Sequence, residues 1–324
     1  MRRRWAWVIA ASLALFLAAC GGGSDGGGGG SSSGSSSALR IGFSPFTLDA
    51  PALQGLSHGL EAYAKEKGYT VLVADPKGDP AKQAQQMQGW ITRKQVDAIW
   101  VIPTTPGALK TTIKSATDAD VVVLASGKPG DYGYDGPGPG LSFNTFDYTD
   151  WGNKTGKLLS ECINSRLGGQ ASVIQVTEPP SAGTGIVETA NAIKSGVTAG
   201  SPNAKIVAEV SSGNDRLKAQ QAVASALQAH RDANALFGTN DEGTLGGMTA
   251  FKQAGKDPKS VCIVGAGGGE SSLAAVKAGD VYGVVAINFQ GDLAQNVDLL
   301  SKMHGDPNAP GQVTNPPLNT VKGS

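Results

Sequence analysis

Short, almost continuously apolar runs alternate with helix-like segments along most of this chain, and that alternation limits the folds open to it. The runs expected to form strands are 40–43, 70–74, 96–102, 121–125, 172–176, 205–210, 235–238, 261–264 and 281–287. Such runs are typical of parallel strands that helices cover on both faces. We therefore predict an α/β protein with doubly wound parallel sheets. Nine strands are too many for one compact sheet of this type, which favours two Rossmann-like lobes joined by a hinge.

Helix signals fill the intervals between these runs. Pro51 begins one amphipathic segment, and the pair Asp79-Pro80 begins the next, with the aspartate as its expected cap. Asp215 precedes another segment, and a last helix is expected from Gln290 to Met303. Strand and helix therefore alternate almost to the end of the chain.

A stretch rich in Gly, Pro, Tyr and Asp at 126–150 interrupts the alternation near its middle. We expect one lobe to comprise residues 39–146 together with 288–324, and the other to comprise 147–287. Parallel α/β sheets bind ligands outside the carboxyl ends of their strands. Two such lobes that face each other across a hinge predict a ligand cleft that closes on its occupant.

The first twenty residues predict export from the cytoplasm. Three arginines precede an apolar run over 5–19, which ends at Cys20. About 15 apolar residues suit a secretory signal peptide and are short of the ~20 that a membrane span needs. The ending Leu-Ala-Ala-Cys resembles a bacterial lipobox, which implies cleavage before Cys20 and lipidation of that residue. The alternative is a plain signal peptide whose last residue is a cysteine.

Residues 21–38 read as a flexible tether, because they are almost all Gly and Ser and have no large apolar side chain to bury. A tether between a lipid and a folded body places that body outside the cytoplasm, in the cell envelope. The chain carries 27 Lys plus Arg against 27 Asp plus Glu, with no basic stripe. Nucleic acid is therefore excluded as a partner on electrostatic grounds.

Three cysteines are too few for a disulfide scaffold, and they are not spaced as a zinc site. Cys162 lies in a helical pattern and Cys262 in a strand pattern. In an oxidising exterior the two could pair, but both also suit buried positions as small apolar residues. The sequence leaves the two alternatives open.

The chain carries no motif that predicts catalysis. Residues 265–269 follow an expected strand as a dinucleotide fingerprint would, but Glu270 stands where the third glycine is needed. From residue 39 onward the sequence contains no G-x-S-x-G, H-E-x-x-H or P-loop. We therefore expect no enzymatic activity, no cofactor and no metal site.

Polar and aromatic residues near the carboxyl ends of the expected strands are the candidates for ligand contact. Aromatic rings pack against a sugar ring or heterocycle, while amides and carboxylates fix the direction of hydroxyl groups. The candidates are Ser44, Phe46, Asp49, Thr104, Ser126, Trp151, Glu178, Asn214, Asn240, Asp241, Gly267, Asn288 and Phe289. Each residue would also serve as a strand cap or turn residue.

The order and spacing of several motifs resemble those of type I periplasmic binding proteins of the ribose/galactose branch. The motifs are IGFS…TLDAP at 41–51, DPAKQ at 79–83, VDAIWVIPTTPGAL at 96–109, NDRLKAQQ at 214–221, ALFGTNDEGTLGG at 235–247 and AVKAGDVYGVVA at 275–286. The resemblance implies two lobes joined by three crossovers that close on a small-molecule solute. It also implies a monomer that delivers this solute to an ABC import permease.

Site residues transfer poorly from that family. Its usual aromatic, amide or charged contacts are missing at Ala52, Leu53, Ile102, Ala125, Ser126, Val187 and Gly267. Only Asn240 keeps its family identity. Charge-assisted hydrogen bonds worth ~1.5–3 kcal/mol each are thereby lost, which predicts a less charged pocket. A sugar, a polyol or another small neutral solute is the expected ligand.

The carboxyl-terminal tail also departs from the family. Residues 304–324 are fewer than the family's final crossover and strand, which indicates an abbreviated crossover or a truncated sequence. Two other functions stay open. One is a sensor that presents its solute to a membrane receptor or kinase, and the other is an extracellular enzyme on the same scaffold, for which no nucleophile–base pair is visible.

Overall fold

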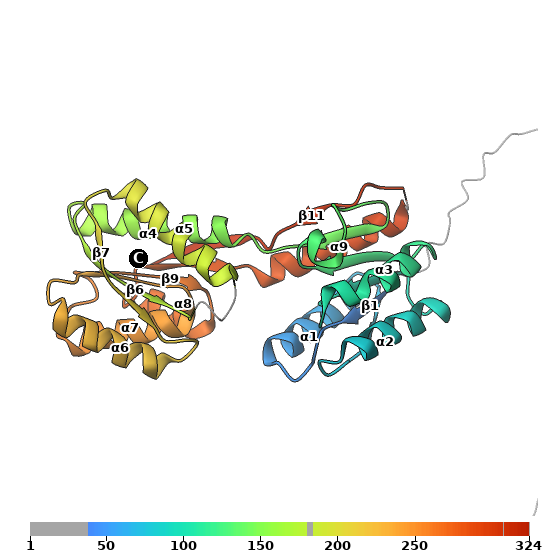
Figure 1. Ribbon diagram of the computed structural model, residues 1–324, viewed down its shortest axis with the longest axis horizontal. Coiled ribbons are helices and arrows are strands. Elements are labelled where there is room, and N and C mark those ends of the chain that lie inside the picture. The colour runs from blue at the N-terminus through green and yellow to red at the C-terminus, as the bar shows by residue number, and fades with distance from the viewer. Residues whose placement is uncertain (1–37, 180–183, 307, 324) are drawn as a thin grey trace, which may run out of the picture. The chain divides into compact units, whose positions relative to one another are not determined.

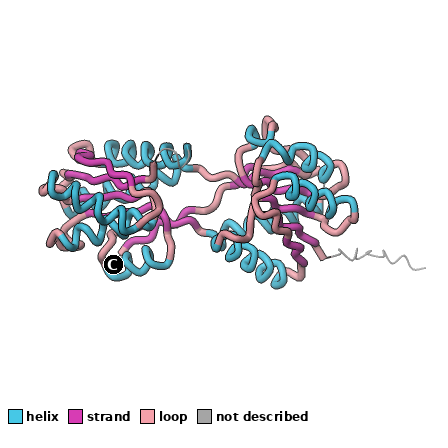
Figure 2. The backbone as a smooth tube through the Cα atoms, turned by 60° about the horizontal axis from the view of Figure 1, so that its bottom comes forward, coloured by secondary structure: helices cyan, strands magenta, loops and turns pink. Residues whose placement is uncertain are grey.

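The computed structural model describes residues 38–179, 184–306 and 308–323. The expected signal peptide, Cys20 and all of the tether except Ala38 lie outside the described residues. Residues from Ala38 onward form one compact unit with two six-stranded sheets, and helices cover each sheet (Figure 1, Figure 2). None of the helices in the described ranges is both long and apolar enough to cross a membrane.

The first sheet has the strand order β11-β5-β4-β3-β1-β2, and its pairings are parallel. Its strands are β1 (Arg40–Ser44), β2 (Thr70–Val73), β3 (Ala98–Val101), β4 (Val122–Ser126), β5 (Leu141–Asn144) and β11 (Val313–Thr314). The first four strands expected from the sequence are confirmed, with small shifts at their ends.

The second sheet has the order β12-β10-β9-β8-β6-β7. Its strands are β6 (Ser172–Thr177), β7 (Lys205–Ser211), β8 (Ala235–Gly238), β9 (Cys262–Gly267), β10 (Gly283–Ile287) and β12 (Leu318–Lys322). β12 is antiparallel to β10, whereas the other pairings are parallel. The five strands expected between 172 and 287 are confirmed.

Each sheet has its own set of helices. On the first sheet these are α1 (Pro51–Glu66), α2 (Pro80–Thr92), α3 (Lys110–Thr117) and α9 (Phe289–Gly305), with short 3-10 turns at Pro106–Leu109 and Pro129–Tyr132. On the second they are α4 (Tyr148–Arg166), α5 (Thr184–Gly200), α6 (Arg216–Ala229), α7 (Asp241–Gln253) and α8 (Glu270–Ala278). The two expected aspartate caps are present: Asp79 accepts from Ala81 N and Lys82 N, and Asp215 accepts from Lys218 N.

The cores confirm the doubly wound arrangement. In β3, Ile99 and Val101 belong to one apolar cluster, while the alternating Ala98 and Trp100 belong to another on the opposite face. The second sheet is likewise buried between two clusters. Because side chains alternate across a strand, burial on both faces explains the continuous apolar runs in the sequence.

The stretch at 126–150 contains a strand that its composition conceals. β5 occupies Leu141–Asn144 and pairs with β4. Its four residues are too short a run to stand out among the flanking glycines and prolines. The stretch is therefore a loop followed by a strand of the first sheet, and the polypeptide leaves the first lobe only after β5.

The tail corrects the division into lobes. The assignment of all of 288–324 to the first lobe holds for α9 and β11, which pack on the first sheet. However, β12 joins the second sheet through five residue pairs with β10. The tail therefore does make the third passage between the lobes, which the short sequence had left open.

The three segments that pass between the lobes are hydrogen-bonded to one another. Thr145 N donates to Thr314 O at 2.8 Å, and Thr145 Oγ1 donates to Asn315 Oδ1 at 2.9 Å. Asn288 N donates to Pro317 O at 2.8 Å. The hinge therefore consists of three chain segments that are linked by hydrogen bonds.

A disulfide joins Cys162 of α4 to Cys262 of β9, with the two Cα atoms 5.7 Å apart. Both residues are fully buried. This resolves the alternative that the sequence left open in favour of pairing. The bridge fastens a helix of the second lobe to the strand beneath it.

Candidate functional site

Three candidates come together at the carboxyl edge of the first sheet. Ser44 ends β1, Thr104 follows β3, and Ser126 ends β4. These strands are neighbours in the sheet, with Val101 of β3 paired with both Ser44 and Ala125. The structure thus brings these three candidates to one edge of the first sheet.

These three residues differ in burial and in hydrogen bonding. Ser44 is 0% exposed, and its Oγ accepts a hydrogen bond from Gln83 Nε2 at 3.2 Å. It therefore supports the site from beneath and offers no surface to a ligand, which corrects its expected role. Ser126 is half-buried, and its Oγ accepts from Trp100 Nε1 at 3.1 Å. Thr104 Oγ1 is buried and has no hydrogen-bond partner.

Phe46 and Asp49 lie on the loop between β1 and α1. Phe46 has an exposed ring, and its carbonyl oxygen accepts from Gly78 N at 2.8 Å, which ties the loop to the one that follows β2. Asp49 is exposed, and its backbone N–H donates to Thr47 Oγ1. Both residues form the rim of the first-lobe strand ends.

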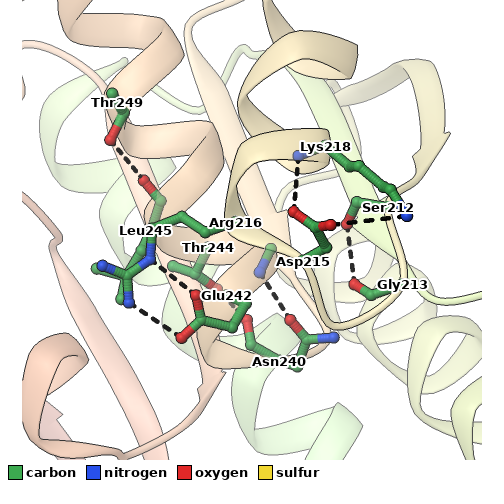
Figure 3. A network of polar contacts seen from close by, with 11 residues as sticks. Ser212, Gly213, Asp215, Arg216, Lys218, Asn240, Glu242, Thr244, Leu245 and Thr249 are labelled. Atoms are coloured by element: carbon green, nitrogen blue, oxygen red, sulfur yellow. Dashed lines mark hydrogen bonds and ion pairs between the residues drawn. The ribbon is translucent and has the colours of Figure 1, made fainter.

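Two candidates of the second lobe contact each other. Asn240 Nδ2 donates to Glu178 Oε1 at 2.8 Å, and the two residues follow the neighbouring strands β8 and β6. Asn240 Oδ1 accepts from Gly243 N at 2.7 Å, so the same side chain caps α7 (Figure 3). The cap fixes the orientation of the amide. Asn214, on the loop before α6, is exposed.

Asp241 and Gly267 interact with each other and with the loop that follows β9. The carboxylate of Asp241 accepts from Gly268 N and Gly269 N, both at 3.0 Å. A Cβ atom on Gly267 would lie 2.2 Å from Asp241 Oδ1, so only glycine fits there. Asp241 is therefore bound to backbone N–H groups, and its half-buried carboxylate stays a candidate for ligand contact.

Trp151 does not lie at the strand ends. It is 9% exposed, belongs to the apolar core of the second lobe, and donates from Nε1 to Val285 O at 2.7 Å. Its indole N–H is thus satisfied inside the protein. Trp151 was a candidate for ligand contact, but α4 turns this position towards the sheet, so its ring packs in the core of the second lobe.

Asn288 and Phe289 begin α9, next to the hinge. Asn288 Oδ1 caps the helix by accepting from Gly291 N at 2.8 Å. Phe289 is 67% exposed. It lines a groove of about 700 Å³ between α1 and α9, together with Gly55, Leu56, Gly59, Ala62, Tyr63, Glu66, Asn288, Gln290, Gly291, Leu293 and Ala294. The phenyl ring is thus part of a surface groove of the first lobe.

A second cavity, of about 520 Å³, lies beside the first hinge segment. Its lining residues are Ser126, Gly127, Lys128, Asp131, Asn144, Thr145, Phe146, Tyr148, Gly185, Glu188 and Pro316. Ser126 is the only one of these that sequence reasoning selected, because the stretch at 126–150 had the composition of a linker. Lys128 Nζ and Glu188 Oε1 face each other here at 4.0 Å.

One buried carboxylate lies at the first-lobe end of the hinge. Asp292 Oδ1 accepts from Asn144 Nδ2 at 3.0 Å and from Gln295 Nε2 at 2.9 Å. Burial raises the pKa of Asp292, and the amide hydrogen bonds oppose that rise. Asn144 also donates to Thr314 Oγ1, so these contacts join β5, β11 and α9. Among residues 38–179, 184–306 and 308–323 there is no group of three metal-ligating His, Cys, Asp or Glu side chains.

A two-lobed α/β fold with polar strand ends and a three-segment hinge defines a class of ligand-binding proteins. A family model for the periplasmic binding protein domain matches residues 41–304. The chain therefore belongs to the periplasmic binding protein family, as its motifs predict.

Individual relatives align with most of this chain. The ribose import binding protein RbsB of Bacillus subtilis is 28% identical over 285 residues, which cover 86% of each chain. The xylitol-binding protein of Mycolicibacterium smegmatis is 26% identical over 276 residues, which cover 85% of this chain and 72% of the relative. A solved structure of a periplasmic ribose ABC transporter protein from Conexibacter woesei has the same fold, with a TM-score of 0.71, 23% identity and coverage of 90% and 94%.

Proposed function

We propose that this chain is an extracytoplasmic substrate-binding lipoprotein that captures a sugar or polyol and delivers it to an ABC import permease. The observation that carries the proposal is the pair of polar strand ends. Thr104 offers a buried hydroxyl without a partner on the first lobe, and the Asn240–Glu178 pair offers an amide and a carboxylate on the second.

The chemistry of these groups suits hydroxyl-bearing solutes. A hydroxyl group donates and accepts hydrogen bonds, so it satisfies a carboxylate oxygen and a threonine hydroxyl alike. A hydrogen bond to the charged Glu178 is worth ~1.5–3 kcal/mol, about twice a neutral one. Asp241 is already bound to two backbone N–H groups, and the strand ends of the first lobe carry serine and threonine. A neutral solute with several hydroxyl groups therefore suits the site best.

The family supports the same ligand class. The relatives named above are a ribose import binding protein and a xylitol-binding protein, and both align with most of this chain. Ribose is a pentose and xylitol is a five-carbon polyol, so both bring a short row of hydroxyl groups. The missing charged contacts of the ribose branch favour a ligand held by fewer charge-assisted bonds.

The disulfide and the first twenty residues support an envelope location. A buried disulfide suits an oxidising compartment outside the cytoplasm. We propose lipidation at Cys20 and a tether over 21–38, as the sequence predicts. A Cys20→Ala variant should lose incorporation of radiolabelled palmitate. Labelling equal to that of the wild type would contradict the anchor.

The ligand class is tested by thermal unfolding of the full chain, purified in mild detergent, with pentoses, hexoses, polyols, nucleosides and amino acids. A solute at 100 times its Kd adds about 2.7 kcal/mol and raises Tm by several degrees. We expect the shift to be confined to sugars or polyols. A shift with amino acids or nucleosides alone would contradict the proposed ligand class.

Variants then connect the ligand to the strand ends. Glu178→Gln should weaken binding of the solute identified above about tenfold or more, because a charged acceptor is replaced by a neutral one. Glu209→Gln is the matched control, because Glu209 is exposed on β7 of the same lobe. Isothermal titration calorimetry of both variants provides the comparison. Equal affinities would remove Glu178 from the site.

A further inference from the structure

Gln83 of α2 occupies a central position beneath the first-lobe strand ends. Its side chain is 0% exposed, although glutamine is a residue that normally lies at the surface. Nε2 donates to Ser44 O at 3.1 Å and to Ile102 O at 3.0 Å, and it lies 3.2 Å from Ser44 Oγ. Oε1 accepts from Thr104 N at 2.8 Å. One amide thus connects the end of β1 with the loop after β3.

The partners of Gln83 fix the orientation of its amide. The acceptors on one side are two backbone carbonyl groups and a hydroxyl, so an N–H group must face them. The only partner on the other side is the N–H of Thr104, which requires an oxygen. Ser44 O also accepts the sheet hydrogen bond from Ile102 N at 2.9 Å, so Gln83 adds a second donor to that carbonyl group. The same amide supplies partners for Ile102 O and Thr104 N, which backbone groups at a strand end need when they are buried.

We propose that Gln83 is a positioning residue for solute binding, which holds the loop after β1 and the loop after β3 at a fixed separation. The inference rests on the proposed function, because Thr104 and Phe46 lie on these two loops. Thr104 donates its backbone N–H to Gln83, while its Oγ1 stays without a partner. Holding the backbone of Thr104 fixes the position of this unpartnered hydroxyl, which is buried in this structure, at the carboxyl edge of the sheet.

The packing of α2 does not depend on this amide. Met87, Trp90 and Ile91 supply the buried apolar contacts of the helix. A Gln83→Met change keeps the length of the side chain and removes its hydrogen bonds. Loop positioning and helix packing can therefore be separated by experiment.

The test compares Gln83→Met with Gln88→Met in the full chain. Gln88 lies on the same helix, and its amide donates to Thr92 Oγ1 at the surface. Calorimetric titration with D-ribose, xylitol and myo-inositol is the binding measurement, and the thermal midpoint is recorded in parallel. We expect Gln83→Met to lose at least tenfold in affinity at temperatures where it stays folded, and Gln88→Met to bind as the wild type does.

A second variant tests the orientation of the amide. Gln83→Glu places a carboxyl group against two backbone carbonyl oxygens. The ionised carboxylate is repelled by these oxygens, whereas the protonated form can donate one hydrogen bond to them. The four groups bonded to Gln83 are themselves uncharged. The affinity of Gln83→Glu relative to the wild type should therefore rise as the pH falls from 8 towards 5. A structural role in packing alone would not produce that pH profile.

Hydrogen exchange of the Thr104 backbone amide tests its hydrogen bond to Gln83 in the absence of any solute. We expect exchange at least tenfold faster in Gln83→Met than in the wild type. If the wild type binds none of the three solutes, these three are excluded as its ligands, while the exchange experiment still decides the role of Gln83. Wild-type exchange at Thr104, or wild-type affinity in Gln83→Met with only a lower thermal midpoint, would overturn the inference.

Discussion

The two lobes hold the loops at their strand ends with opposite chemistry. In the first lobe a fully buried, uncharged amide, Gln83, serves two carbonyl groups and one N–H. In the second a half-buried carboxylate, Asp241, serves only N–H groups, those of Gly268 and Gly269. An amide both donates and accepts, whereas a carboxylate only accepts and stays closer to water. The loop to be held thus determines which side chain can hold it.

The disulfide is a further difference, because it lies in the second lobe. Replacing both Cys162 and Cys262 by alanine should lower the free energy of unfolding of that lobe by about 2–5 kcal/mol, the usual cost of losing a native bridge. Hydrogen exchange under increasing denaturant separates the lobes, and β3 of the first lobe should keep its protection. An equal loss of protection in both lobes would show that they unfold as one unit.

Asp241→Ala should lower the free energy of unfolding by about 2 kcal/mol, because two backbone N–H groups lose their charged acceptor. Asp241→Asn keeps one amide oxygen and should lose less. Denaturant unfolding of both variants is the measurement. Asp280→Ala, which removes a surface ion pair with Lys252, is the control. If the alanine variant is no less stable than this control, the comparison between the lobes fails.

The buried Asp292 predicts a pH effect in the first lobe. Its raised pKa means that the folded chain binds this proton more tightly than the unfolded chain does. That stabilisation is complete below the ordinary aspartate pKa and is lost as the pH rises through the folded value. Asp292→Asn should abolish this loss, so its stability relative to the wild type should rise as the pH increases through that window. Stability curves that stay parallel between pH 4 and 8 would contradict it.

Asp97 predicts a pH dependence of stability of the opposite sign in the same lobe. Its bidentate bond to Arg40 lowers the pKa of Asp97, so its contribution is present at neutral pH and is lost as the pH falls through the folded value. Asp97→Asn should therefore lose stability at pH 7 and little at pH 2. Measuring this variant beside Asp292→Asn controls for general acid effects on the chain.

The smallest effect is expected at the ion pair between α6 and α7. Arg216 donates from Nε and Nη2 to the two carboxylate oxygens of Glu242, as Figure 3 shows. Both side chains are substantially exposed, and such pairs are worth ~0–1 kcal/mol. Arg216→Ala should therefore lower the free energy of unfolding by less than ~1 kcal/mol, and added salt should make this loss smaller still. A loss above 2 kcal/mol in urea unfolding would mean that the pair has a structural role.

Local signals in the sequence predicted much of the fold. Continuous apolar runs predicted nine strands that the structure contains. Asp79 and Asp215 each precede a helical pattern in the sequence, and each caps a helix in the structure. These features depend on residues a few positions apart. β12 escaped prediction because its five residues gain their stability from pairing with β10, some thirty positions earlier.

The sequence predicted which candidate residues lie at strand ends better than it predicted their burial and contacts. Thr104 and Asn240 lie at strand ends because strand order and direction follow from the alternation. Their neighbours depend on contacts that no local pattern contains. Ser44 is hidden by Gln83, which comes 39 positions later, and Trp151 is turned into the core by α4. Burial of a polar or aromatic side chain is decided by what packs over it.

The return of β12 to the second sheet affects the order in which the molecule can be completed during synthesis. The second lobe contains residues 147–287 and is finished by Leu318–Lys322, so its last edge strand emerges after the whole of α9 and β11. Until then β10 is the edge of that sheet, with unpaired N–H and C=O groups that attract other chains. Nascent chains that stop short of Leu318 should therefore be prone to aggregation, and a chaperone that covers β10 would protect them.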